Sequence, residues 1–176
     1  MIRVERVCLS GTVNGGNELA DKASIEAAKS GSKALQGADL SGISMRGVDL
    51  SGANLTGANL SRADLSEACL WQCNLAEATL AGARLHAAQL QGANLEGADL
   101  TAADLQGSQL WDACLRDAKL MSANLTGVSL WDADLRGADL TGAVMWMTNV
   151  QGARLSGSSG ADLSRCMFVE RAILKD

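Results

Sequence analysis

Residues 50–60 read Leu-Ser-Gly-Ala-Asn-Leu-Thr-Gly-Ala-Asn-Leu, and this five-residue pattern extends over most of the chain. Between residues 40 and 155, every fifth residue is Leu at 21 of 24 positions. The residue two places before each of them is Ala at 18 of the 24. Such self-similarity at a fixed period indicates a repeat architecture, so the fold has to be one that a period of five allows.

A period of five fits neither a helix nor a continuous strand. On an α-helix, five residues advance the face by roughly 140°, so the leucines would wind around the cylinder instead of forming a stripe. On a strand, an odd period would send alternate leucines to opposite faces. The pattern therefore predicts a three-residue extended segment with Ala and Leu pointing inward, followed by a two-residue corner. Because such short segments cannot satisfy their own backbone groups, successive coils must pair in parallel.

The A(D/N)LxG pattern resembles the consensus of the pentapeptide-repeat protein family over residues 34–155. Representative units are residues 53–57 and 98–102. The resemblance implies an all-β fold, a right-handed quadrilateral β-helix with four units in each 20-residue coil. About six coils, rising roughly 4.8 Å each, would form a rod about 29 Å long.

A 20-residue coil makes a prediction about charge, because residues 20 apart should stack. Asp64, Arg84 and Asp104 would then alternate in sign along one column, an arrangement that stabilises neighbouring strands. Arg116 would lie against Arg136, which is the unfavourable arrangement.

Residues 1–33 are expected to cap the first coil, since the end of a solenoid otherwise exposes leucines and unpaired backbone. Weak alternation within residues 1–13 predicts a short strand. Closely spaced alanines before Ser30 predict a helix with Gly31 as its stop.

Residues 156–176 are expected to form an irregular final coil, because three extra residues enter the register there. The pattern should then resume with Leu163, Phe168 and Ile173 facing inward. The adjacent run Met167, Phe168 and Val169 either plugs this end or contacts a second copy of the chain. The family resemblance implies a homodimer through the C-terminal coils.

Composition excludes several classes of function. The net charge is −5, and residues 34–155 hold thirteen acidic and seven basic residues, so the chain lacks the basic stripe needed for direct nucleic-acid binding. The five cysteines are odd in number and lack zinc spacing, which predicts free thiols and no metal or other cofactor. No signal peptide and no membrane-spanning run is evident, so we expect a cytoplasmic protein.

Tryptophan provides the strongest surface signal. Trp71, Trp111 and Trp131 fall in one predicted column with Gln91, and Trp146 falls at the neighbouring corner. Outward aromatic side chains on a surface of small residues suggest an edge that binds a partner. The alternatives are that a terminal segment covers them or that the indoles stack on one another for stability.

The remaining polar residues allow a functional and a structural interpretation. His86, the only histidine, has no partner converging on it, so a solvated corner residue is expected. The outward carboxylates either imitate DNA phosphates or bond to nearby backbone N–H groups. The second interpretation is preferred, since acids alternate with bases along the columns; the carboxylates concerned are Asp39, Asp49, Asp64, Asp99, Asp104, Asp134 and Asp139.

Two functions remain open. Neither is enzymatic, because the sequence shows no phosphate-binding loop, no nucleophile motif and no cluster of converging polar groups. The first is a non-catalytic scaffold that presents flat faces to an unidentified protein partner. The second, implied by the family resemblance, is a DNA mimic that protects or inhibits DNA gyrase, as in quinolone resistance. The chain departs from such proteins by using Leu instead of Phe at the central inward site and by having no internal loop.

Overall fold

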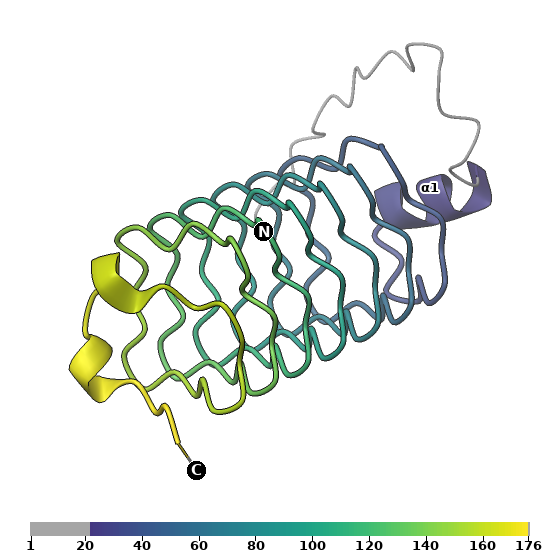
Figure 1. Ribbon diagram of the computed structural model, residues 1–176. Coiled ribbons are helices and arrows are strands. Elements are labelled where there is room, and N and C mark those ends of the chain that lie inside the picture. The colour runs from purple at the N-terminus through teal and green to yellow at the C-terminus, as the bar shows by residue number, and fades with distance from the viewer. Residues whose placement is uncertain (1–21, 176) are drawn as a thin grey trace, which may run out of the picture.

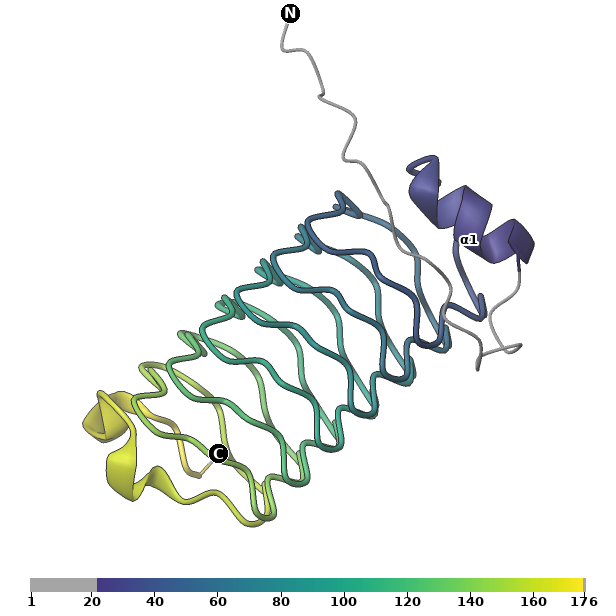
Figure 2. The same ribbon diagram turned by 90° about the horizontal axis from the view of Figure 1, so that it is seen from above.

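Each five-residue unit pairs with the next coil through a single backbone bridge. In the computed structural model, which describes residues 22–175, twenty-two consecutive parallel bridges join residues 20 apart, from Ala34↔Asn54 to Asp139↔Ser159. No strand longer than one bridge forms among the described residues. The predicted 20-residue coil is confirmed, and Figures 1 and 2 show the coils stacked into a rod.

The backbone of every coil is hydrogen-bonded to both neighbours. The N–H of Gln89 donates to the carbonyl of Ala68 in the preceding coil at 2.9 Å, and the N–H of Leu70 donates to the carbonyl of Gln89 at 2.7 Å. Within the corner, the N–H of Cys73 donates to the carbonyl of Leu70 at 3.1 Å. These bonds repeat along the rod and meet the requirement that isolated three-residue segments cannot meet alone.

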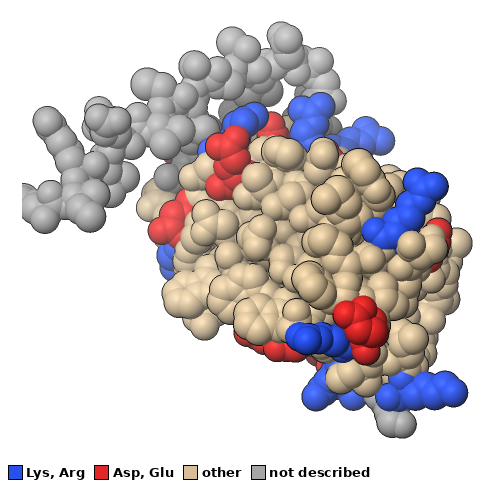
Figure 3. All heavy atoms as spheres, turned by 90° about the vertical axis from the view of Figure 1, so that its left-hand side faces the viewer, with Lys and Arg blue, Asp and Glu red and all other residues tan. Residues whose placement is uncertain are grey.

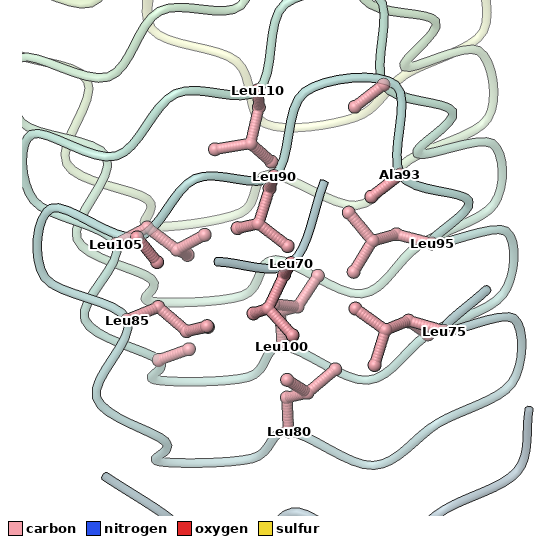
Figure 4. Close-up of a cluster of buried hydrophobic side chains, with 14 of the residues drawn as sticks. Leu70, Leu75, Leu80, Leu85, Leu90, Ala93, Leu95, Leu100, Leu105 and Leu110 are labelled. Carbon is pink, nitrogen blue, oxygen red and sulfur yellow. The ribbon is translucent and has the colours of Figure 1, made fainter. Parts of the chain in front are cut away.

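The interior is a column of leucines ringed by alanines. All 24 predicted central positions between residues 40 and 155 are buried. Figure 4 shows Leu70, Leu90 and Leu110 stacked in register, each pointing toward the axis. Most of the paired alanines are fully buried as well, so the inward pattern is confirmed. Leucine fills the axis while alanine keeps the coil narrow, which is why a larger residue at an alanine position would overpack it.

The N-terminal end carries the only α-helix of the described residues, α1 (Lys22–Lys29), which lies beside the first coil in Figure 1. Ala28 is buried in the hydrophobic core, and Ile25 and Ala27 pack against it. The helix ends at Lys29, and the chain turns away at Gly31, whose φ of 78° is left-handed. The short strand expected within residues 1–13 lies outside the described residues.

At the C-terminal end, the prediction that the repeat resumes with inward-facing residues holds for Leu163 but is wrong for Phe168 and Ile173. Two 3-10 turns, η1 (Leu163–Arg165) and η2 (Val169–Arg171), replace the regular units. The final bridges are Asn149↔Met167 and Arg154↔Ile173. Each joins residues that are fewer than 20 apart in the sequence, because η1 occupies the place of one regular unit.

This shortened path rotates the last apolar residues out of register. Phe168 has φ 58° and is 47% exposed, and Ile173 is 42% exposed. Leu163 packs against the core as predicted, and Cys166 and Val169 pack there as well.

Candidate binding surface

Four ladders of bridges run along the rod, one on each side of the coil, and we name each face after one member of its ladder. The Asn74 face and the Arg84 face lie opposite each other, as do the Asp99 face and the Gln89 face, because five residues separate one side from the next. The ladders are Asn54, Asn74, Asn94, Cys114, Asp134, Arg154; Ser44, Asp64, Arg84, Asp104, Asn124, Val144; Asp39, Asn59, Thr79, Asp99, Lys119, Asp139; and Asp49, Cys69, Gln89, Gln109, Ser129, Asn149.

Three of these faces carry charges of both signs. Bridges place Arg84 between Asp64 and Asp104, so the predicted alternating column is confirmed. Partial burial raises the pKa of Asp64, but hydrogen bonds from Ser66 and the charges of Arg84 and Arg46 outweigh it and lower the pKa overall. Charges of opposite sign therefore neutralise one another along the column instead of forming an acidic field.

The outward carboxylates also stabilise the corners by accepting hydrogen bonds from backbone N–H groups. Asp49 Oδ1 accepts the N–H of Ser51 at 2.9 Å, and Asn54 Oδ1 accepts the N–H of Thr56 at 3.1 Å in the same geometry. Since a neutral amide serves as well as a carboxylate, this position requires an oxygen acceptor and does not require charge. Hydrogen bonds from the side chain and backbone of Ser51 lower the pKa of Asp49, as expected for a carboxylate that accepts them. The preferred structural interpretation of these residues is thereby supported.

The Gln89 face differs from the other three, because it carries no charge over five coils. We define the neutral face as the ladder positions and the first corner positions on both sides, between residues 66 and 151. None of these fifteen residues is acidic or basic: Ser66, Cys69, Trp71, His86, Gln89, Gln91, Gln106, Gln109, Trp111, Thr126, Ser129, Trp131, Trp146, Asn149 and Gln151.

All four tryptophans of the chain border this face. Trp71, Trp111 and Trp131 occupy one corner column, and Trp146 occupies the other, as the sequence predicted. Trp71, Trp131 and Trp146 are 48%, 47% and 54% exposed, and Trp111 is partly exposed. Among the described residues no segment buries these indoles, so the alternative of a covering terminal segment is not seen in residues 22–175.

Met147 adds an exposed apolar side chain at the same corner as Trp146. It occupies the second corner position, which has a left-handed backbone throughout the repeat and is most often Gly. A bulky residue at φ 55° is held there against its preference, at a cost on the order of 1 kcal/mol.

A second apolar surface lies at the C-terminal end of the rod. Met167 and Phe168 are exposed there, whereas Val169 packs against the core, so only the first two of the three predicted dimer residues face solvent. Figure 3 looks onto this end and shows Lys, Arg, Asp and Glu near its rim around an uncharged centre. Met167 also bridges Asn149 and thus continues the Gln89 ladder to this end.

The remaining reactive side chains of residues 22–175 do not converge. His86 is an exposed corner residue of the neutral face. Burial raises the pKa of Cys73 to about 11 and that of Cys166 to about 11, so both thiols stay protonated at neutral pH. Within residues 22–175 no group of three His, Cys, Asp or Glu side chains could hold a metal ion. No helix in that range is long and apolar enough to cross a membrane.

Sequence reasoning found the tryptophans but missed the neutrality of the whole face. The signal was available, because five of the seven glutamines fall at ladder or corner positions of this one side. It becomes visible only when residues are grouped by the 20-residue coil, since along the chain the same glutamines are scattered among charged residues.

The family model described as pentapeptide repeats (8 copies) matches residues 34–72, 58–97, 83–120 and 118–157. These segments together span more than two thirds of the chain. None of the curated proteins matches the sequence.

Several solved structures are similar to the chain. HetL, a pentapeptide repeat protein involved in heterocyst differentiation regulation in the cyanobacterium Nostoc sp. strain PCC 7120, is 30% identical, with 81% of each chain covered and a TM-score of 0.31. A second protein from Nostoc PCC 7120, alr5209, is 26% identical over 88% of this chain and 93% of its own, with a TM-score of 0.47. The plasmid-mediated fluoroquinolone resistance protein QnrB1 is 21% identical over 81% of this chain and 80% of its own, with a TM-score of 0.42.

Proposed function

Because the chain belongs to the pentapeptide repeat family, whose members fold as right-handed β-helices, we propose that it is a non-catalytic scaffold that binds a protein partner through its neutral face. The observation that carries the proposal is the segregation of side chains around the rod. All four tryptophans lie at corners of the one face whose ladder and first corner positions carry no charge between residues 66 and 151, while the other three ladders carry mixed charges.

The physical argument is the cost of burying polar groups. A charged side chain loses its hydration when a partner covers it, whereas indole and amide side chains lose little and can form stacking contacts and hydrogen bonds. Interface centres are accordingly depleted in charged residues and enriched in Trp. A rod whose neutral side also carries its indoles is therefore suited to bind along that side.

The same structure favours binding over catalysis. The outward carboxylates accept corner N–H groups, burial raises the pKa of the Cys73 and Cys166 thiols, and His86 stands alone at its corner. Catalysis needs a nucleophile, base or acid placed within hydrogen-bonding reach of one another. The repeat instead distributes its polar groups along the rod, and a non-catalytic scaffold is the role that this distribution supports.

Site-specific photo-crosslinking in cells tests the proposal. A photoreactive phenylalanine analogue at Gln109 probes the neutral face, and the same residue at Thr79 is the matched control, since both are partly buried ladder positions on opposite sides. We expect a discrete heterologous adduct from position 109 and none from position 79. Adducts from position 79 alone, or from neither position, would contradict the proposal.

The alternative function is protection or inhibition of DNA gyrase by imitation of DNA. The excess of acidic residues in the repeat favours it, and the alternation of acids with bases opposes it. A supercoiling assay with and without a fluoroquinolone separates the two. Inhibition, or rescue from drug-induced cleavage, at micromolar protein would establish the alternative, and no effect at high micromolar protein would exclude it.

We also propose that a second copy of the chain contacts the C-terminal end. Met167 and Phe168 are exposed at that end. The open end of a solenoid leaves apolar groups and backbone uncovered, and association with a second copy would cover them. Sedimentation equilibrium should give a dimer for the wild type and a monomer for Phe168→Asp. A monomeric wild type, or a variant that remains dimeric, would refute this contact.

A further inference from the structure

We propose that the occupant of the neutral face is an uncharged, proline-rich segment of the partner in the polyproline II conformation. This inference rests on the proposed function and names the chemistry of its partner. Three properties of the face lead to it: the absence of charge, the kind of polar group that it offers, and the spacing of its tryptophans.

The first two properties match what a proline-rich segment needs. Proline has no N–H, so such a segment presents carbonyl acceptors and apolar rings, and the site must supply donors and flat apolar surfaces. Indole rings supply both, because each has an apolar face and an N–H donor, and glutamine amides supply further donors. Between residues 71 and 151, the corner column that holds Trp71, Gln91, Trp111, Trp131 and Gln151 consists of these two residue types alone.

The spacing matches as well. Trp71 and Trp111 are two coils apart along one corner, which corresponds to about 9.6 Å at the spacing of neighbouring strands. A polyproline II helix repeats every three residues, or about 9.3 Å. Ring i and ring i+3 of a proline-rich segment lying along the rod therefore meet the two indoles in register. Aromatic surfaces that recognise polyproline helices in other folds use the same pairing of rings with aromatic side chains.

Other occupants fit less well. A segment of this chain cannot supply the ligand, because the sequence contains no proline. Single-stranded nucleic acid stacks on aromatic rings but also requires a basic groove, and none of the fifteen positions is basic. A charged peptide would find no counter-ion among the fifteen positions, since the nearest carboxylates, those of Glu67, Asp112 and Asp132, occupy second corner positions outside the neutral face. A neutral oligosaccharide shares the lack of charge, so it is included as a competing outcome of the test.

The protein carries its own reporter for the measurement. It has four tryptophans and no tyrosine, and all four lie at the two edges of the neutral face, so its intrinsic fluorescence responds to ligands bound there. The probe is a decaproline peptide with acetylated and amidated ends, which is uncharged and does not fluoresce. A Gly-Ser peptide of the same length and linear neutral hexasaccharides of glucose are the comparison ligands. We expect a saturable change in emission with decaproline only.

Two variants show whether the change in emission comes from decaproline bound at the neutral face. Trp111→Ala/Trp131→Ala removes two indoles and leaves Trp71 and Trp146 to report. Alanine is compatible with these corners, since Ala76 already occupies an equivalent first corner position. Losing two hot-spot aromatic side chains should weaken decaproline binding by about 30-fold or more. The control is Met121→Ala, an exposed apolar residue at the diagonal corner of the same coil as Trp131, and it should bind as the wild type does.

The possible results separate this inference from the proposed function. Saturable binding that the double variant loses and the control keeps would support it. No binding of decaproline, equal binding by the double variant, or a response to the hexasaccharides instead would overturn it. The photo-crosslinking at Gln109 does not depend on the decaproline probe. An adduct there without decaproline binding would therefore support the proposed scaffold function and show that the partner is not a proline-rich segment.

Discussion

Ser108 offers a direct test of how the interior of the rod is stabilised. Its side chain is fully buried at a position that is Ala in most units, and its Oγ has no hydrogen-bond partner among residues 22–175. A buried hydroxyl without a partner costs about 1–3 kcal/mol. Ser108→Ala removes that hydroxyl and leaves no cavity, so the free energy of unfolding should rise by about 1–3 kcal/mol.

Thr148 provides the matched comparison, because it lies two coils further along the same inward column. Its hydroxyl donates to the carbonyl of Leu125 at 2.8 Å, 23 residues upstream. Cys73 bonds in the same way to Leu50. Thr148→Val would lose a satisfied hydrogen bond and should lower the free energy of unfolding by about 1 kcal/mol, a change of opposite sign.

Urea unfolding of the wild type and both variants measures these changes as shifts in the midpoint at constant slope. A lower midpoint for Ser108→Ala would refute the reasoning, since it would mean that the hydroxyl finds an acceptor, the Leu85 carbonyl being the equivalent one. A change in slope would indicate that the coils unfold in separate groups, as repeat proteins can.

Three further predictions concern the core, the corners and the carboxylates. Leu90→Ala, at the fully buried axis, should lower the free energy of unfolding by about 2–5 kcal/mol, measured by urea unfolding. Gly160→Ala should cost about 1–3 kcal/mol more than Gly57→Ala, because both glycines have positive φ but a Cβ at 160 would lie 2.5 Å from the Cα of Thr141 whereas a Cβ at 57 meets open space; equal melting temperatures would contradict this. The pKa of Asp99 is lowered in the folded state, so its contribution is present above the unfolded value of about 3.9 and is lost as the pH falls through the lower folded value. Asp99→Asn should therefore flatten the decline of the thermal midpoint below about pH 4, and an unchanged pH profile would count against the assignment.

The sequence predicted the repeat body because one physical constraint recurs in every unit. Leucine at each central position and alanine two residues earlier allow only a short segment with both side chains inward, followed by a corner. The bridges confirm the 20-residue coil that results. The tryptophan corner followed from the same register. These features are predictable because each residue repeats the environment of the one 20 positions away.

The C-terminal end was not predictable in this way. The leucine spacing indicated that Phe168 would face inward, but η1 shortens the path by part of a unit, and Phe168 turns to solvent in a left-handed conformation. A 3-10 turn of three residues leaves no periodic signal. The neutrality of the Gln89 face was likewise hidden, because it is a property of positions that are neighbours only after coiling.

The measurement that tests the central claim most directly is the affinity of the cross-linked partner for three forms of the protein. These are the wild type, Trp111→Ala/Trp131→Ala on the neutral face, and Asp99→Asn/Asp139→Asn on the opposite face. If the neutral face is the binding surface, the tryptophan variant should bind at least tenfold more weakly, while the aspartate variant binds within a factor of about two of the wild type. The reverse order, with binding lost when the carboxylates are neutralised and kept when the indoles are removed, would contradict the account.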